Sequence, residues 1–198
     1  MNSKKVLKDL ERLKELEGID NLVTVFGGSR FSEDSKEYKE AVELGRALGL
    51  AGFNVVTGGS GGLMEATNRG VKEVGETLSI GIHLTNLPNE ERPNIYLDKK
   101  FCFNYFFTRK IALINYSKAF IVLSGGFGTL DEFFEVLNLM RTGRIEESPI
   151  FLLGRDYWGD IYEYMQKVML KSQTISKRDL DLILISDNIN QIVESIKD

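Results

Sequence analysis

The chain has 198 residues and a net charge of −4, with 42% apolar and 27% charged residues. This composition is ordinary for a globular protein, and the length allows a substantial core. The acidic balance weighs against a nucleic-acid partner, no apolar run is long enough to span a membrane, and the charged N-terminus is unlike a signal peptide.

Strand-like and helix-like runs alternate along the chain. Residues 1–20 carry leucines at helical spacing, which predicts an amphipathic helix packed on the domain or on a partner subunit. Strands are then expected near Leu22–Phe26, Phe53–Thr57, Ser79–Leu84, Ala119–Leu123, Pro149–Leu153 and Leu182–Ile185. Helices are expected near Lys36–Ala51, Gly62–Val74, Tyr105–Tyr116, Thr129–Arg141, Trp158–Met169 and Asn188–Ile196. The alternation predicts a single α/β domain over residues 1–198, a Rossmann-like doubly wound parallel sheet with helices on both faces.

Three glycine-rich turns each follow a predicted strand: Gly27–Arg30, Gly58–Gly62 and Gly125–Thr129. Glycines let backbone N–H groups approach a ligand closely, and the start of the following helix adds positive dipole character, so such turns favour a phosphate. The carboxyl ends of parallel strands share one edge of the sheet, where doubly wound folds bind ligands. We therefore expect one ligand site lined by Gly58, Gly59, Gly61, Gly125, Gly126, Phe127, Gly128 and Thr129.

Two carboxylates, Asp131 and Glu132, fall in the first turn of the helix predicted after the third glycine turn. A carboxylate beside a phosphate cradle suggests chemistry on a phosphorylated sugar. There is also a structural alternative, because Thr129 and Glu132 fit the capping-box pattern, in which the glutamate only caps its own helix.

Several common sites are excluded. The turns that contain Gly59 and Gly126 do not complete the dinucleotide pattern G-x-G-x-x-G. The chain also has no Gly-Lys dipeptide, which a P-loop requires. The single cysteine, Cys102, cannot form an internal disulfide, which fits the reducing cytoplasm and the role of a small core residue. The one histidine, His83, lies in a strand pattern, where a core or strand-end role is favoured over catalysis. A metal site built on several His and Cys residues is excluded, and no cofactor is predicted.

Two further segments carry hypotheses. The run Phe106-Phe107-Thr108-Arg109-Lys110 places two basic residues on a predicted helix, where one could point to the glycine turns and pair with a phosphate, or both could lie on a solvated face. The aromatic residues around it are interpreted as core rather than as a platform for stacking bases. The irregular segment Thr85–Asn94 follows a strand and could cover the ligand site.

The motifs GGSGGLMEATNRG, FFTRK and SGGFGTLDE, in this order, resemble those of the LOG ("lonely guy") family, long labelled "possible lysine decarboxylase". The family pattern is GGG-x-x-GLM, an Arg-Lys pair and PGG-x-GT-x-x-E. The similarity extends from about residue 23 to residue 164, and the EATNRG and RTG portions look like the longer, bacterial branch. Ser60 and Ser124 replace a glycine and a proline of the pattern, and loss of the proline could loosen the third turn.

The resemblance implies a phosphoribohydrolase, which cleaves the N-glycosidic bond of a nucleoside 5′-monophosphate, such as AMP or a cytokinin riboside monophosphate, to free base and ribose 5-phosphate. By the motifs, Arg109 and Glu132 would be the catalytic pair. Substrate contacts would come from Glu90, Lys110, the turn from Gly125 to Asp131, and Asn138, where the family often has threonine.

A carboxylate near the ribose can stabilise the ribosyl cation or activate water, so this chemistry agrees with the residues considered alone. The alternative is a carrier or sensor that holds a nucleotide-like ligand without turnover, as related molybdenum cofactor carriers do. The Arg109–Glu132 pair favours the hydrolase. A decarboxylase would need pyridoxal phosphate on a lysine, for which only Lys110 lies near a motif. We also expect a homo-oligomer, because the helices after residues 105 and 129 carry more large apolar residues than one sheet face needs.

Overall fold

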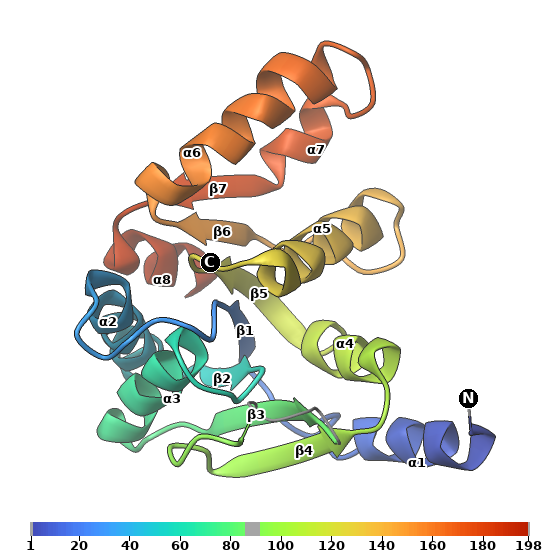
Figure 1. The fold of residues 1–198 in the computed structure, drawn as a ribbon, viewed down its shortest axis with the longest axis vertical. Coiled ribbons are helices and arrows are strands. Elements are labelled where there is room, and N and C mark those ends of the chain that lie inside the picture. Colours follow the sequence, from blue (N-terminus) through green and yellow to red (C-terminus); the bar gives the residue numbers. More distant parts are fainter. Residues whose placement is uncertain (1, 86–91, 198) are drawn as a thin grey trace.

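The computed structural model describes residues 2–85 and 92–197, and within these residues seven strands form one sheet (Figure 1). All pairs of neighbouring strands are parallel, in the order β4-β3-β2-β1-β5-β6-β7. The strands are β1 (Leu22–Phe26), β2 (Asn54–Thr57), β3 (Ser79–Leu84), β4 (Lys99–Phe103), β5 (Ser117–Val122), β6 (Ile150–Leu153) and β7 (Ile183–Ser186). The predicted Rossmann-like α/β class is confirmed.

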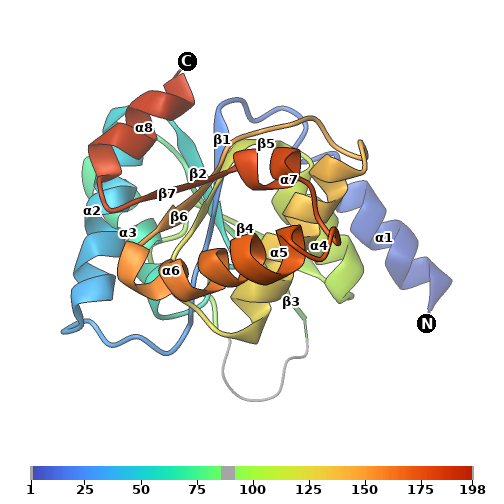
Figure 2. The same ribbon diagram turned by 90° about the horizontal axis from the view of Figure 1, so that it is seen from above.

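Helices cover both faces of this sheet (Figure 2). They are α1 (Ser3–Leu13), α2 (Lys36–Leu50), α3 (Leu63–Val74), α4 (Phe106–Ile114), α5 (Phe127–Arg141), α6 (Arg155–Tyr164), α7 (Lys177–Asp181) and α8 (Ile189–Lys197), with a π-helical segment η1 (Met165–Leu170) after α6. Residues of α2, α3 and α8 form one core with the sheet, and residues of α4, α5, α6 and α7 form a second core on the other face.

The central strands show why both faces are covered. Every residue of β1 is buried, because its side chains alternate between the two cores: Val23 and Val25 join the core with α2 and α3, whereas Leu22 and Phe26 join the core with α4 and α5. Phe26 stacks on Phe120 of β5, with ring centroids 6.1 Å apart. A continuous apolar run therefore indicates a central parallel strand.

The strand order reverses its direction at β1. The chain proceeds from β1 to β2, β3 and β4 on one side, and then crosses to β5 on the other side of β1. In open parallel sheets a crevice forms at the carboxyl edge where the order reverses, because the two connections leave in opposite directions. Here the segments after β1 and β5 meet at that point, and both are glycine-rich.

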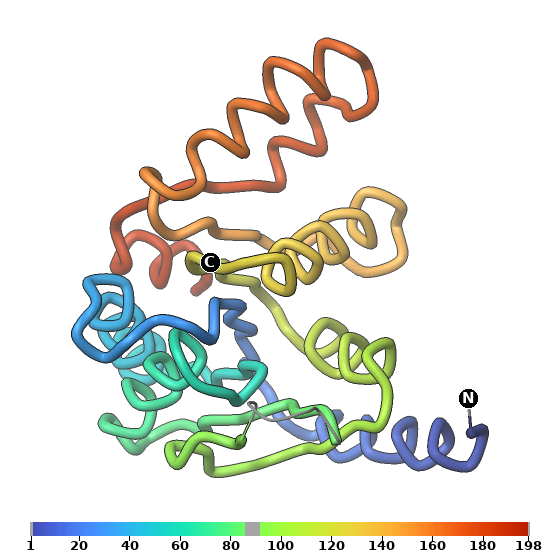
Figure 3. Tube along the Cα trace, viewed as in Figure 1, coloured from blue at the N-terminus to red at the C-terminus, as the bar shows by residue number. Residues whose placement is uncertain are grey.

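Three parts of the fold differ from the sequence-based prediction. Strand β4 was not predicted, because only Phe101 and Phe103 point into the core, while Lys99 and Lys100 are exposed as is common on an edge strand. The helix expected over 158–169 divides into α6 and η1, and the short α7 was also missed. Figure 3 traces this C-terminal arm of the chain, which runs out along α6 and η1 and returns through α7.

The N-terminal helix α1 ends at Leu13, short of the predicted residue 20, and is fixed to the domain by a buried carboxylate. Asp9 is fully buried and accepts hydrogen bonds from the Asn104 backbone and side-chain nitrogens, at 2.8 and 2.6 Å, and from the Thr108 hydroxyl at 2.7 Å. Asp9 thus ties α1 to the first turn of α4. In the described part of the chain no helix has the length and apolar character needed to cross a membrane.

Candidate active site

The three predicted glycine turns meet at the carboxyl edge of β2, β1 and β5. The Gly28 N–H donates to the Ser124 carbonyl at 2.9 Å, and the Leu63 N–H donates to the Gly28 carbonyl at 2.9 Å. A Cβ on Gly28 would lie 3.2 Å from the Gly125 Cα atom, so these backbones can approach closely only because glycine occupies the position. The turn after β1 therefore bridges the other two, as the shared edge predicted.

A cleft of about 650 Å³ opens between the turns after β1 and β5 and the start of α4. It is lined by Gly27, Gly28, Ser29, Arg30, Phe31, Met64, Phe106, Arg109, Lys110, Gly125, Gly126, Phe127, Gly128, Thr129, Asp131, Glu132 and Tyr157. Most of the predicted site residues are thus brought together.

The start of α5 supplies hydrogen-bond donors to this cleft. The helix begins at Phe127 with Gly126 as its N-cap, and no side chain of residues 2–85 or 92–197 caps it. Within the described residues, the backbone N–H groups of residues 125–129 donate to no protein acceptor, whereas the Leu130 N–H bonds the Gly126 carbonyl at 3.0 Å. Such unpaired N–H groups at a helix N-terminus make a binding site for an anion.

The capping-box interpretation of Thr129 and Glu132 is wrong, because the helix begins two residues before Thr129. Thr129 instead packs on Gly125, where a Cβ would lie 2.2 Å from the threonine hydroxyl oxygen. Asp131 and Glu132 consequently fall in the second turn of α5, not in the first as predicted. Glu132 lines the cleft beside the turn after β5 and makes an electrostatic or hydrogen-bond contact of its own.

Arg109 projects from α4 to the centre of the site. Its side chain is buried, with 8% of the residue exposed, and its Nε donates to the Ile82 carbonyl at 2.9 Å. A Cβ on Gly58 would lie 2.5 Å from one terminal nitrogen of the guanidinium, so Gly58 is required for this placement. The backbone contact fixes the guanidinium through Nε, one terminal nitrogen lies against Gly58, and Arg109 lines the cleft. A buried, fixed cation of this kind suits a phosphate or a carboxylate.

Lys110 is engaged with α5. Its Nζ pairs with Asp131 at 2.7 Å and with Glu135 at 2.9 Å. Burial lowers the pKa of the Lys110 ammonium, but its hydrogen bonds to the two carboxylates outweigh this and raise the pKa above its ordinary value. Lys110 therefore stays charged and joins α4 to α5, which fixes Asp131 in the cleft wall.

His83 lies behind the second glycine turn, at the end of β3, where it is 3% exposed. A Cβ on Gly59 would lie 2.4 Å from its Nε2 atom, so the imidazole packs directly against this glycine. Neither ring nitrogen has a hydrogen-bond partner in the described parts of the chain. Burial, with the nearby charges of Arg109 and Lys100, lowers the pKa of His83 from 6.5 to about 4. The ring is neutral at pH 7, as befits a core residue beside an arginine.

The depressed pKa of His83 makes stability depend on pH. In the unfolded chain the imidazole takes up a proton near pH 6.5, but the folded protein resists it until about pH 4. The free energy of unfolding should therefore fall as the pH drops from about 6.5 to 4, by at most about 1.4 kcal/mol per pH unit from this group. Urea denaturation at pH 7 and pH 5 should show that the wild type loses more free energy of unfolding between these pH values than His83→Leu does. Equal losses in the two proteins would contradict the lowered pKa of His83.

Not every predicted site residue lines the cleft. Gly58, Gly59 and Gly61 stand behind it, and they shape it through their contacts with Arg109, His83 and α3. Asn138 lies farther along α5, where its side-chain oxygen accepts a hydrogen bond from Arg141 Nε at 3.2 Å. Glu90, and most of the irregular segment predicted to cover the site, lie outside the described residues.

Other lining residues were not among the predicted site residues, although Arg30 belongs to the predicted turn Gly27–Arg30. Arg30 comes from the turn after β1, Met64 from α3 and Tyr157 from α6. The prediction that the aromatic run before Arg109 is core holds for Phe101 and Phe103, which are buried. It is wrong for Phe106 and Phe107, which are exposed, and Phe106 lines the cleft.

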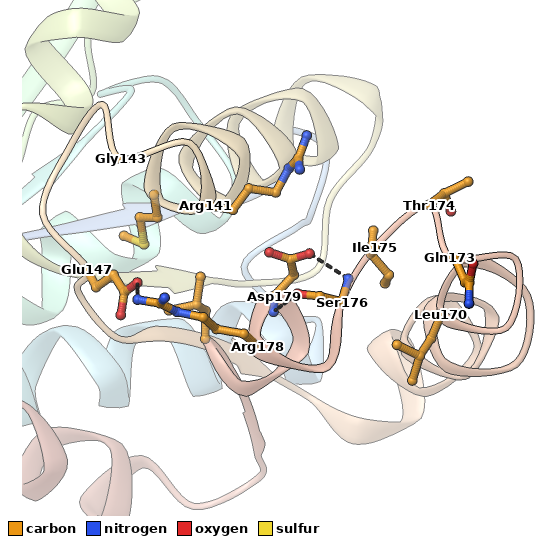
Figure 4. Close-up of a pocket in the computed structure, with 12 residues that line it drawn as sticks. Arg141, Gly143, Glu147, Leu170, Gln173, Thr174, Ile175, Ser176, Arg178 and Asp179 are labelled. Carbon is orange, nitrogen blue, oxygen red and sulfur yellow. Dashed lines mark hydrogen bonds and ion pairs between the residues drawn. The ribbon is translucent and has the colours of Figure 1, made fainter.

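A larger hollow, of about 890 Å³, lies between the end of α5 and the loop from η1 to α7 (Figure 4). Its charged groups are already engaged. Arg178 pairs with Glu147 at 2.6 Å, and Asp179 accepts from the Ser176 N–H at 2.7 Å within a capping box. None of the described residues that line this hollow belongs to one of the three glycine turns or carries a buried charge, so we place the site at the smaller cleft.

The sequence matches the family model described as "Possible lysine decarboxylase" over residues 64–196. The chain belongs to this family, also called the LOG family. The resemblance drawn from the three motifs is thereby confirmed.

Curated members of the LOG family are similar along most of the chain. The cytokinin riboside 5′-monophosphate phosphoribohydrolase LOG4 of Arabidopsis thaliana is 28% identical over 178 residues, which is 89% of this chain and 81% of the relative.

Two solved structures share the fold. The molybdenum cofactor binding protein of Rippkaea orientalis has a TM-score of 0.68 at 22% identity, covering 91% of this chain and 98% of that one. The molybdenum cofactor carrier protein of Chlamydomonas reinhardtii has a TM-score of 0.66 at 19% identity, covering 90% and 97%.

The decarboxylase label of the LOG family does not fit this cleft. A lysine that forms a Schiff base with pyridoxal phosphate must lose its proton. Among the described residues that line the cleft the lysine is Lys110, and its two carboxylate partners hold it charged.

Proposed function

We propose that the protein is a nucleoside 5′-monophosphate phosphoribohydrolase, acting on AMP or a cytokinin riboside monophosphate. The observation that carries the proposal is that one cleft contains three groups: the N–H groups of residues 125–129, which donate to no acceptor among the described residues, the buried guanidinium of Arg109, and the carboxylate of Glu132. The names of the curated relatives support the same activity.

Each group has a role in this reaction. The N–H groups of residues 125–129 hold the 5′-phosphate, and Arg109 adds a fixed positive charge. Binding of the phosphate positions the ribose, so that part of the binding energy is used to orient the scissile bond. As the bond from C1′ to the base nitrogen breaks, positive charge develops on the ribose, and the Glu132 carboxylate stabilises it. The bonding electron pair leaves with the base nitrogen. Water then supplies the oxygen that bonds C1′, and one of its protons stays on the new hydroxyl while the other balances the proton that the base nitrogen takes up.

The test is to incubate the protein with a panel of nucleoside 5′-monophosphates and measure free base and ribose 5-phosphate in equal amounts. The matching nucleosides, which have no phosphate, serve as controls and should be poor substrates. Release of base from nucleosides and nucleotides at equal rates would contradict the role of the phosphate turn.

A second candidate is a carrier or sensor of a nucleotide-like ligand, because the solved structures above include proteins named for molybdenum cofactor binding. The same panel separates the two functions. A carrier would bind a ligand tightly and release no base, and it would tolerate loss of the Glu132 carboxylate.

We further propose that the protein is a homo-oligomer in the cytoplasm. Phe106 and Phe107 of α4 and Phe134 of α5 are 59%, 44% and 39% exposed, and both helices cover the same face of the sheet. Exposed aromatic side chains on neighbouring helices are typical of an interface. Light scattering at micromolar concentration should give a mass above that of the 22.4 kDa chain.

A further inference from the structure

Three consecutive carbonyl groups at the start of the turn after β5, those of residues 124–126, each accept a hydrogen bond. The Ser124 carbonyl accepts from the Gly28 N–H at 2.9 Å, and the Gly126 carbonyl accepts from the Leu130 N–H at 3.0 Å. Between them, the Gly125 carbonyl accepts a hydrogen bond from the hydroxyl of Tyr157. Tyr157 lies on α6, 32 residues farther along the chain, and the other two donors are backbone groups.

A held carbonyl fixes the direction of the next N–H group. A trans peptide unit is planar, and its C=O and N–H bonds point in opposite directions. The bond from Tyr157 to the Gly125 carbonyl therefore turns the Gly126 N–H away from α6. In the same way Gly28 orients the Gly125 N–H. Both N–H groups belong to the set that donates to no acceptor in the described residues.

This peptide unit would otherwise rotate easily. It joins Gly125 to Gly126, and glycines adopt a wide range of backbone angles at little cost. Ser124 does not restrain the turn either, because its φ angle is free, unlike that of a proline. The peptide unit between Gly125 and Gly126 is therefore held in one orientation by a hydrogen bond from another element of the fold.

We propose that Tyr157 is a positioning residue, which orients the Gly126 N–H toward the 5′-phosphate of the substrate. This inference rests on the proposed function for the identity of the ligand. Tyr157 touches the turn rather than the scissile bond, so its contribution falls on phosphate binding and not on the chemical step.

Tyr157→Phe removes only the hydroxyl. The ring should keep its edge contact with Trp158, whose centroid is 5.1 Å away, so the fold is expected to survive. We expect the Kd for ribose 5-phosphate and the KM for the nucleotide to rise by between about threefold and tenfold, which is the usual loss of affinity when one hydrogen bond is removed. We expect kcat, and the affinity for the nucleoside without its phosphate, to change less than about twofold.

The matched control is Tyr164→Phe, on the same helix, where the side chain is exposed and the residue does not line the cleft. It should bind ribose 5-phosphate like the wild type. An unchanged Kd for ribose 5-phosphate in Tyr157→Phe would overturn the proposal, as would an equal loss of affinity for the nucleoside.

These outcomes are separate from a failure of the proposed function. A wild type that releases no base but binds ribose 5-phosphate in a Tyr157-dependent way would remove the hydrolase and leave the positioning role. A wild type that binds neither ribose 5-phosphate nor inorganic phosphate at millimolar concentration would overturn both.

Discussion

Glu132→Gln is expected to lower the rate of base release from a nucleoside monophosphate by about 100- to 1,000-fold, the usual cost of losing one group that faces charge in the transition state. Glutamine has nearly the same size, and because α5 begins at Phe127, five residues before Glu132, the helix does not depend on this residue for capping. The loss should therefore appear in kcat, while the Kd for ribose 5-phosphate stays within about twofold.

Glu135→Gln is the matched control for this experiment. It makes the same change of charge about one turn farther along α5, outside the cleft lining, and leaves Lys110 its partner Asp131. We expect its rate to remain within about threefold of the wild type. A Glu132→Gln protein with wild-type kcat would remove the proposed mechanism and leave the carrier as the better candidate.

Much of the fold follows from the sequence because the central strands are buried on both faces. The strands Leu22–Phe26 and Ser79–Leu84 are almost wholly buried. The first is apolar except for Thr24 and the second has an apolar residue at every other position, and both were predicted residue for residue. Lys99–Phe103 was missed because an edge strand needs only one buried face. Its two lysines reach the solvent, and two buried aromatic residues do not establish a period.

The candidate site is predictable to the extent that it consists of local turns. A glycine turn between a strand and a helix has a sequence signature, and the parallel sheet brings three such turns to one edge. Two features could not be predicted in this way. The start of α5 depends on the Gly126 carbonyl accepting the Leu130 N–H, a bond that the T-x-x-E pattern does not reveal. Tyr157 reaches Gly125 from 32 residues away, and no spacing rule connects them.

Arg109→Met should reduce both binding and turnover, in contrast to Glu132→Gln. The guanidinium is buried, is fixed by the Ile82 carbonyl and lies against Gly58, so its positive charge acts at short range with little screening by water. Losing a charged hydrogen-bond donor to a phosphate costs about 1.5–3 kcal/mol, so we expect the Kd for ribose 5-phosphate to rise between about 10- and 150-fold.

Methionine keeps an unbranched stem in the space that Arg109 occupies, which limits the cavity left behind, and a thermal melt should show that the fold is retained. Arg109→Lys provides the second arm. It keeps the charge but cannot both bond the Ile82 carbonyl and present two terminal nitrogens, so it should recover only part of the affinity. A different result would be that Arg109→Met binds ribose 5-phosphate as tightly as the wild type and loses only kcat. Arg109 would then act on the leaving base or the ribose, and binding of the phosphate would depend on the N–H groups at the start of α5.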